Sequence, residues 1–161
     1  MDLVQGSDAV AELVKDVRDA LAIVRVKALN SLNLTLKKAR VEIEISTKDT
    51  TKAGGKFEFG ISLDASVKRQ KADVHVISLM LEPIGLAGKL GGDQAHDLAD
   101  SILALAAVRN TITTLKSTDF KLGDMELEVR FERTKSGGLQ IVCGGESESG
   151  NTQRVTLYFR E

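Results

Sequence analysis

An internal repeat constrains the fold of this 161-residue chain more than any other feature of its sequence. The alternating segment at 41–45, VEIEI, has a counterpart at 125–129, MELEV, with apolar residues and glutamates in the same places. Strict alternation of this kind predicts a half-buried strand in each half of the chain. A Gly-Gly pair follows each strand, at 54–55 and at 137–138. Two glycines between alternating runs favour a hairpin turn, because glycine adopts positive φ at little steric cost.

Two further alternating segments follow in each half and predict a second and a third strand. The second strands are expected at 57–61 and 139–143, and the third strands at 75–81 and 153–159. The apolar positions of the third strands match in order, Ile77, Leu79 and Leu81 with Val155, Leu157 and Phe159. Each half is therefore predicted to contain a three-stranded antiparallel meander.

A helical pattern precedes the strands in each half. In the first half, one helix face collects the apolar residues Val10, Leu13, Val14, Val17, Leu21, Val24 and Ala28. In the second half, after an expected N-cap near Asp93, the same spacing connects Leu98, Ile102, Leu105, Ala106 and Ile112. The stretch 103–108 is apolar almost all round, so the second helix is expected to pack against the first helix as well as against the sheet.

These elements predict an α+β protein built from two tandem αβββ repeats. The first repeat is expected at 8–83, a Gly-rich linker at 84–92 and the second repeat at 93–161. A single repeat of this size would leave sheet edges and one flank of its helix uncovered. We therefore expect the helices on one face of the sheets, and the two repeats related by a pseudo-two-fold axis in one compact body.

Composition and charge exclude several classes of function. Apolar residues make up 42% and charged residues 28% of the chain, which is typical of a globular protein and too hydrophobic for a disordered one. The formal net charge is -1 and aromatic residues make up only 4%, so nucleic-acid binding is disfavoured. No apolar run is long enough to span a membrane, and the first residues do not resemble a signal peptide. Together with the single cysteine, Cys143, this pattern favours the cytoplasm.

Residues suited to catalysis, metal binding or cofactor binding do not form a recognisable motif. His75 and His96 are the only histidines, and neither has clustered cysteines or carboxylates at the spacing of metal ligands. No Gly-x-Ser-x-Gly nucleophile turn occurs, and Cys143 is expected at an inward strand position as a small core residue. We therefore predict no catalytic residue, no metal ligand and no cofactor.

Four glutamates occupy outward positions of the equivalent first strands, namely Glu42, Glu44, Glu126 and Glu128. Paired carboxylates suit acid–base chemistry or a divalent ion. The commoner arrangement is a solvated sheet face, and we expect cross-strand ion pairs with basic residues such as Arg40, Lys56 and Arg130.

The candidate partner-binding residues lie at the hairpin tips and on the outward face of the sheet. The first tip is basic and the second is acidic, and opposite charges at equivalent tips suit the steering of a partner. On the outward face, apolar residues occupy strand positions whose side chains point away from the core. The candidates are Lys68, Arg69, Lys71, Glu146, Glu148, Val76, Met80 and Tyr158.

The order of elements in the first half resembles a known bacterial family. A leading helix is followed by the strand at 41–45, the turn at 54–55, a Phe-x-Phe strand at 57–59 and a closing strand at 73–83 that ends in Leu-Glu-Pro. This arrangement is similar to the second type of trypsin-co-occurring domain over residues 8–83. The second repeat has Thr-Gln-Arg-Val at 152–155 where the family has Thr-His-Arg-Val, and it lacks the histidine and the closing proline.

The resemblance implies a non-catalytic partner of trypsin-like peptidases or of NTPase-linked bacterial conflict and signalling systems. The leading hypothesis is therefore a protein-binding or adaptor module with a protein partner, and self-association into a homo-oligomer stays open. Two alternatives come from other classes of protein. One is a small-ligand sensor that binds between the repeats, and the other is a hydrolase-type accessory enzyme that uses His75 with a nearby serine or aspartate.

Overall fold

The computed structural model describes residues 3–49, 57–60, 74–85, 95–115, 119–134, 136–143 and 152–161. Its helical elements are α1 (Leu3–Lys27), the π-helical turn η1 (Ala28–Leu32), α2 (His96–Ala106) and α3 (Val108–Thr113). Its strands are β1 (Thr35–Asp49), β2 (Phe57–Gly60), β3 (Val74–Leu81), β4 (Met125–Arg133), β5 (Leu139–Ile141) and β6 (Gln153–Arg160).

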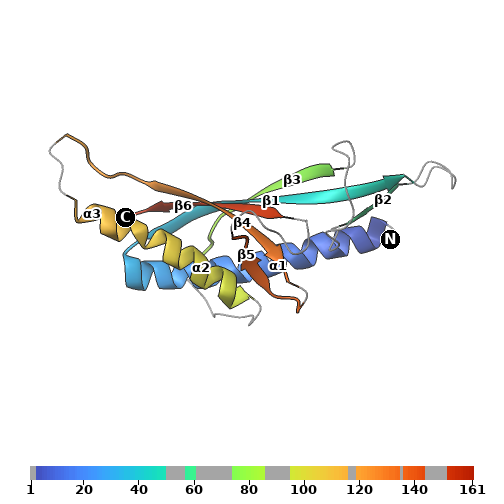
Figure 1. Ribbon diagram of the computed structural model, residues 1–161, viewed down its shortest axis with the longest axis horizontal. Coiled ribbons are helices and arrows are strands. Elements are labelled where there is room, and N and C mark those ends of the chain that lie inside the picture. Colours follow the sequence, from blue (N-terminus) through green and yellow to red (C-terminus); the bar gives the residue numbers. More distant parts are fainter. Residues whose placement is uncertain are drawn as a thin grey trace.

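Helices and strands form two layers, shown in Figure 1. The strands pair antiparallel and belong to one sheet. In Figure 1, α1 and α2 lie together on one side of this sheet, and buried apolar side chains from both layers form the core. The predicted α+β class is confirmed.

The apolar face of α1 supplies the helical side of the core. Its predicted residues Leu13, Val17, Leu21, Val24 and Ala28 are buried, and Val10 and Val14 pack against them while partly exposed. The helix ends in η1, after which Asn33 adopts a left-handed φ of 54°. Asparagine tolerates this conformation, and the Leu34 N–H then donates to the Ala28 carbonyl oxygen at 3.1 Å. This hydrogen bond closes the helix as the chain turns back into β1.

The second helix agrees with the sequence prediction only in part. Its buried apolar residues step by four along α2, at Leu98, Ile102 and Ala106. Leu105 and Ile112 were expected on this face, but they are 41% and 44% exposed. Leu105 falls to one side of the buried stripe, and an interruption at Ala107 places Ile112 in the separate helix α3. As predicted, α2 packs against α1 as well as against the sheet, whereas Asp93 lies outside the described residues.

The predicted meander is wrong, because the first strand of each half lies in the middle. Ser46 of β1 pairs with Gly60 of β2 and with Val74 of β3, so these two strands lie on opposite edges of β1. In the second half, β4 likewise pairs with both β5 and β6. The meander prediction assumed that consecutive strands are neighbours. The 15-residue β1 is long enough to pair with several strands along its two edges.

The two halves meet through β6, which lies between β1 and β4. Val155 pairs with Val41 on one side and with Val129 on the other. A two-fold joint would also place β3 beside β4, but β3 pairs with the far edge of β1. The strand order is therefore β3-β1-β6-β4-β5, with β2 on the remaining length of β1, and it lacks the predicted pseudo-two-fold form. A central position removes both edges of β6 from solvent.

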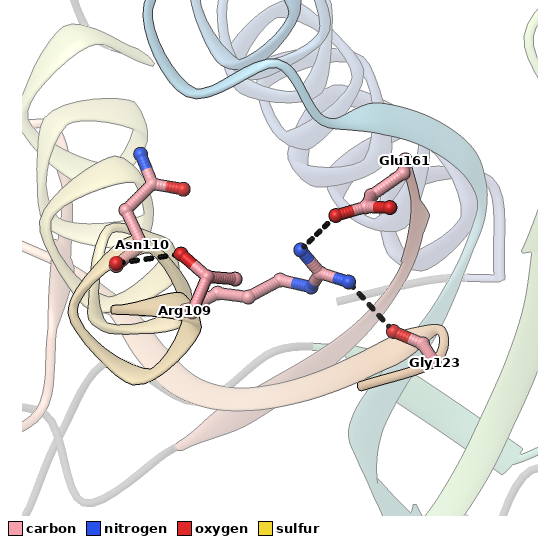
Figure 2. A network of polar contacts seen from close by, with 5 residues as sticks. Arg109, Asn110, Gly123 and Glu161 are labelled. Atoms are coloured by element: carbon pink, nitrogen blue, oxygen red, sulfur yellow. Dashed lines mark hydrogen bonds and ion pairs between the residues drawn. The ribbon is translucent and has the colours of Figure 1, made fainter. Parts of the chain in front are cut away.

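A buried arginine attaches α3 to the sheet, as Figure 2 shows. Arg109 is only 4% exposed. One guanidinium nitrogen pairs with Glu161 Oε1 at 3.1 Å, and the other donates to the Gly123 carbonyl oxygen at 2.8 Å. Its Nε has no hydrogen-bond partner among the described residues, and Glu161 supplies the opposite charge. The two guanidinium contacts hold α3 against the end of β6 and the segment that leads into β4.

We expect Arg109→Ala to lower the free energy of unfolding by about 2–3 kcal/mol, because the buried stem and both hydrogen bonds are lost. Glu161→Ala should cost about 1 kcal/mol, because this carboxylate is 65% exposed and water replaces it at the guanidinium. Urea denaturation of the two variants measures the difference. Equal losses would contradict the role of Arg109 as a buried attachment point.

Candidate protein-binding face

The sheet face opposite the helices, called the outer face below, carries most of the charged strand residues. On β1, and on β4 as far as Phe131, buried or half-buried apolar residues alternate with exposed or half-buried polar ones, so the polar set points away from the core. The residues of this face on β1, β3, β4 and β6 are Lys38, Arg40, Glu42, Glu44, Val76, Ser78, Met80, Glu126, Glu128, Arg130, Arg154, Thr156 and Tyr158.

Tyr158 lies in a row between Lys38 of β1 and Glu126 of β4. The Lys38 ammonium lies 5.0 Å from the centroid of the tyrosine ring, in cation–π distance. A side-chain hydrogen bond to Glu126 stabilises the neutral phenol and, with a smaller contribution from burial, raises the pKa of Tyr158 above its usual 10.0. This row connects the two halves of the chain across β6.

Arg154 forms a second charged row four residues along β6 from Tyr158. Its Nε lies 3.1 Å from Glu128 Oε1, and a second nitrogen lies 4.0 Å from Glu42 Oε2. The expectation that Arg40 and Arg130 pair with these glutamates is therefore wrong, and Lys56 lies outside the described residues. The physical reason is the central place of β6, which brings one arginine within reach of carboxylates on both neighbouring strands.

A cavity of about 340 Å³ opens beside Arg154 on the outer face. Both halves of the chain line it, with Glu42, Glu44, Val76, Arg130, Thr152, Gln153 and Arg154. Arg130 and Arg154 are directly opposite in the strand register, which places two positive charges side by side. Arg154 is neutralised by its glutamates, whereas neither Arg130 nor Glu44 forms an ion pair with any described residue.

Gln153 fixes the backbone at the inner end of this cavity. Its side chain is 2% exposed, its Oε1 accepts the Glu44 N–H at 2.5 Å, and its Nε2 donates to the Glu44 carbonyl oxygen at 3.4 Å. The Gln153 amide thus adds two hydrogen bonds to β1, next to the last residue pair of the two strands, Glu42 with Arg154. Sequence reasoning missed this role, although a glutamine at a core-facing strand position is a signal, since a buried amide needs hydrogen-bond partners.

The structure places three of the candidate partner-binding residues on the outer face. Val76 and Met80, on β3, are 55% and 42% exposed, and Tyr158 is half-buried on β6. Across β1, Val76 is paired with Glu44 and Met80 with Arg40, so the apolar side chains adjoin the charged rows. The remaining candidates lie outside the described residues: Lys68, Arg69, Lys71, Glu146 and Glu148.

The single cysteine and the histidines show no sign of a reactive site. Cys143 is exposed, which contradicts its predicted core position, because β5 ends at Ile141 and the strand alternation stops there. His75 is exposed at the start of β3, and His96 begins α2 half-buried. Within the described residues, no group of three or more His, Cys, Asp or Glu side chains could hold a metal ion. In the same part of the chain, every helix is too short or too polar to cross a bilayer.

The single tyrosine of the chain offers a direct test of the outer-face geometry, since the chain has no tryptophan. Glu126→Ala should lower the pKa of Tyr158 towards 10.0, because the main cause of its increase is removed. Glu128→Ala, in the next row, is the control and should leave the pKa unchanged. Ultraviolet absorbance of tyrosinate during an alkaline titration measures both.

The raised pKa of Tyr158 also makes the stability of the folded chain depend on pH. The folded-state pKa of Tyr158 is raised, so its stabilising contribution is complete below pH 10.0 and is lost as the pH rises through the folded-state pKa. A wild-type titration at or below the ordinary tyrosine pKa would rule out the hydrogen bond to Glu126.

Comparison with known proteins agrees with the resemblance noted for the first half. Neither a curated protein nor a solved structure matches the chain. Residues 9–83, just under half of the chain and spanning most of α1 through β3, match the family model for trypsin-co-occurring domain 2.

Proposed function

We propose that this chain is a non-catalytic protein-binding or adaptor module that receives its partner on the outer face. The match of residues 9–83 to trypsin-co-occurring domain 2 supports a partner in a trypsin-like peptidase system or in an NTPase-linked bacterial conflict or signalling system. The partner-binding residues in this proposal are those of the outer face, together with five charged residues outside the described part of the chain, namely Lys68, Arg69, Lys71, Glu146 and Glu148.

One observation carries the proposal, namely the combination of exposed apolar side chains with organised charge on the outer face. Val76 and Met80 are exposed on β3. The charged rows of Tyr158 and Arg154 begin on the neighbouring strand β1 and extend across β6 to β4. Protein interfaces combine an apolar centre with polar and charged surroundings, and arginine, tyrosine and methionine are enriched in them. The helix-covered face of the sheet is already occupied by the core.

We further propose that the chain consists of two tandem αβββ repeats, at 8–83 and 93–161, joined by the linker 84–92. The hairpin registers support this, since Thr47 pairs with Phe59 as Phe131 pairs with Ile141. In both halves the first strand lies between the second and the third.

The third strands correspond with a shift of two residues from the sequence alignment. Val41 pairs with Leu79, and its counterpart Met125 pairs with Phe159. Phe159 is therefore the structural counterpart of Leu79, in place of Leu157. Alternation cannot detect such a shift, because a two-residue slip keeps every apolar side chain on the same face.

The experiment is an affinity capture from lysate of the native host, read by mass spectrometry. Wild type should retain a trypsin-like peptidase or an NTPase of such a system. The double variant Val76→Asp with Met80→Asp should lose it, because two carboxylates then occupy the apolar part of the outer face. Leu115→Asp is the matched control, since Leu115 follows α3 and is 73% exposed. A second variant reverses the charges of Lys68, Arg69 and Lys71.

Two outcomes would overturn the proposal. In one, the same peptidase or NTPase is retained equally by wild type, the outer-face variant and the control, which would place the interface elsewhere. In the other, none of the variants or the wild type retains a defined protein of these classes. Circular dichroism of each variant checks that the fold is intact.

The second candidate is a small-ligand sensor, favoured by the cavity that both halves line. Its volume of about 340 Å³ is near the lower end of the range for small-molecule sites. A metabolite that binds there should raise the melting temperature of wild type, and should do so less in Arg130→Ala. A thermal-shift screen measures this, and equal stabilisation of both proteins would rule out the cavity as the site. The hydrolase-type alternative built on the exposed His75 has no comparable support among the described residues.

A further inference from the structure

We propose that the cavity on the outer face binds an extended segment of the partner that carries an acidic and a basic side chain four residues apart. The inference rests on the proposed protein-binding function and specifies the chemistry of the bound segment. The acidic side chain pairs with Arg130 of β4, and the basic side chain pairs with Glu44 of β1.

The charges that line the cavity determine which ligands suit it. Four charged side chains line the cavity, and two of them, Arg154 and Glu42, already lie within ion-pair distance of each other. Arg130 and Glu44 have no ion-pair partner among the described residues and have opposite charges. A complementary ligand is therefore dipolar. A polyanion such as nucleic acid would meet as many carboxylates as guanidinium groups in this cavity, which disfavours it.

The distance between Arg130 and Glu44 limits which ligands can contact both side chains. Arg130, Arg154 and Glu42 are in register across three neighbouring strands, and Glu44 lies two residues further along β1. Two strand spacings are about 10 Å, and two residues along a strand are about 7 Å, so the backbone positions of Arg130 and Glu44 are about 12 Å apart. The opposite charges of a free amino acid are too close together to meet both groups.

A peptide segment in the extended conformation covers this distance. An extended chain rises about 3.3 Å per residue, so four residues span about 13 Å, and side chains four apart point to the same side. A separation of two residues spans only about 7 Å, and a separation of three turns the second side chain away. Val76 lines the cavity next to Glu44, on the side away from Arg130, and is 55% exposed, so it offers an apolar contact to the part of the segment just beyond the basic side chain.

The test uses short fluorescent peptides on an uncharged Thr/Val background, with one Asp and one Lys separated by two, three, four or six positions. Fluorescence anisotropy with the full chain measures the dissociation constant of each peptide. The peptide with a separation of four should bind most tightly. Arg130→Ala and Glu44→Ala should each weaken it by about two- to fivefold, as expected for a partly exposed ion pair.

Charge complementation separates a specific site from general stickiness. Glu44→Lys should prefer a peptide with two Asp residues at the same separation, and Arg130→Glu should prefer the peptide with two Lys residues. Arg40→Ala is the matched control for Arg130, because Arg40 is exposed on the outer face and does not line the cavity. It should leave the affinity for the best peptide unchanged.

Affinity that does not depend on the separation, or that survives both Arg130→Ala and Glu44→Ala, would overturn this inference. The result is distinguishable from failure of the proposed function. If Val76→Asp with Met80→Asp abolishes capture of the native partner while Arg130→Ala with Glu44→Ala does not, the binding function stands and the proposed ligand chemistry is wrong.

Discussion

The insertion of β6 between β1 and β4 is the interaction on which the rest of the structure depends. Its inward residues Val155, Leu157 and Phe159 are fully buried, while both of its edges are hydrogen-bonded to strands from the two halves. One continuous sheet results, and both helices have a common surface to cover. Because neither half alone supplies that surface, the core is fully buried only when the two halves associate.

The position of β6 also determines the chemistry of the outer face. Arg154 stands between Glu42 and Glu128, which come from different halves, and its single positive charge interacts with both carboxylates. Arg130 and Glu44 are left as an opposite pair across the cavity, held in place by the backbone ladder that Gln153 extends. The proposed recognition of a dipolar segment therefore depends on the joined sheet, since each half provides only one of the two charges.

Local features were predictable from the sequence, and the partners of each element were not. The helical spacing correctly identified the buried face of α1, and alternation correctly separated Val41 and Ile43 from Glu42 and Glu44. Cys143 was placed wrongly because the length of β5 depends on its pairing with β4. The ion pairs of the glutamates were placed wrongly because Arg154 is remote from both in the sequence. Strand neighbours depend on contacts between distant residues, which periodicity does not contain.

The sequence by itself determined the α+β class, the existence and direction of most strands, and which side chains of each strand face the core. These properties follow from the two-residue and 3.6-residue repeats of the backbone, which act within a single element. Only the tertiary structure decided that β6 is the central strand, that β3 lies at an edge, and that Arg130 and Glu44 border one cavity. The physical reason is that several strand orders satisfy the same alternation, and the choice among them depends on how completely they bury the apolar faces and pair the free edges of both halves.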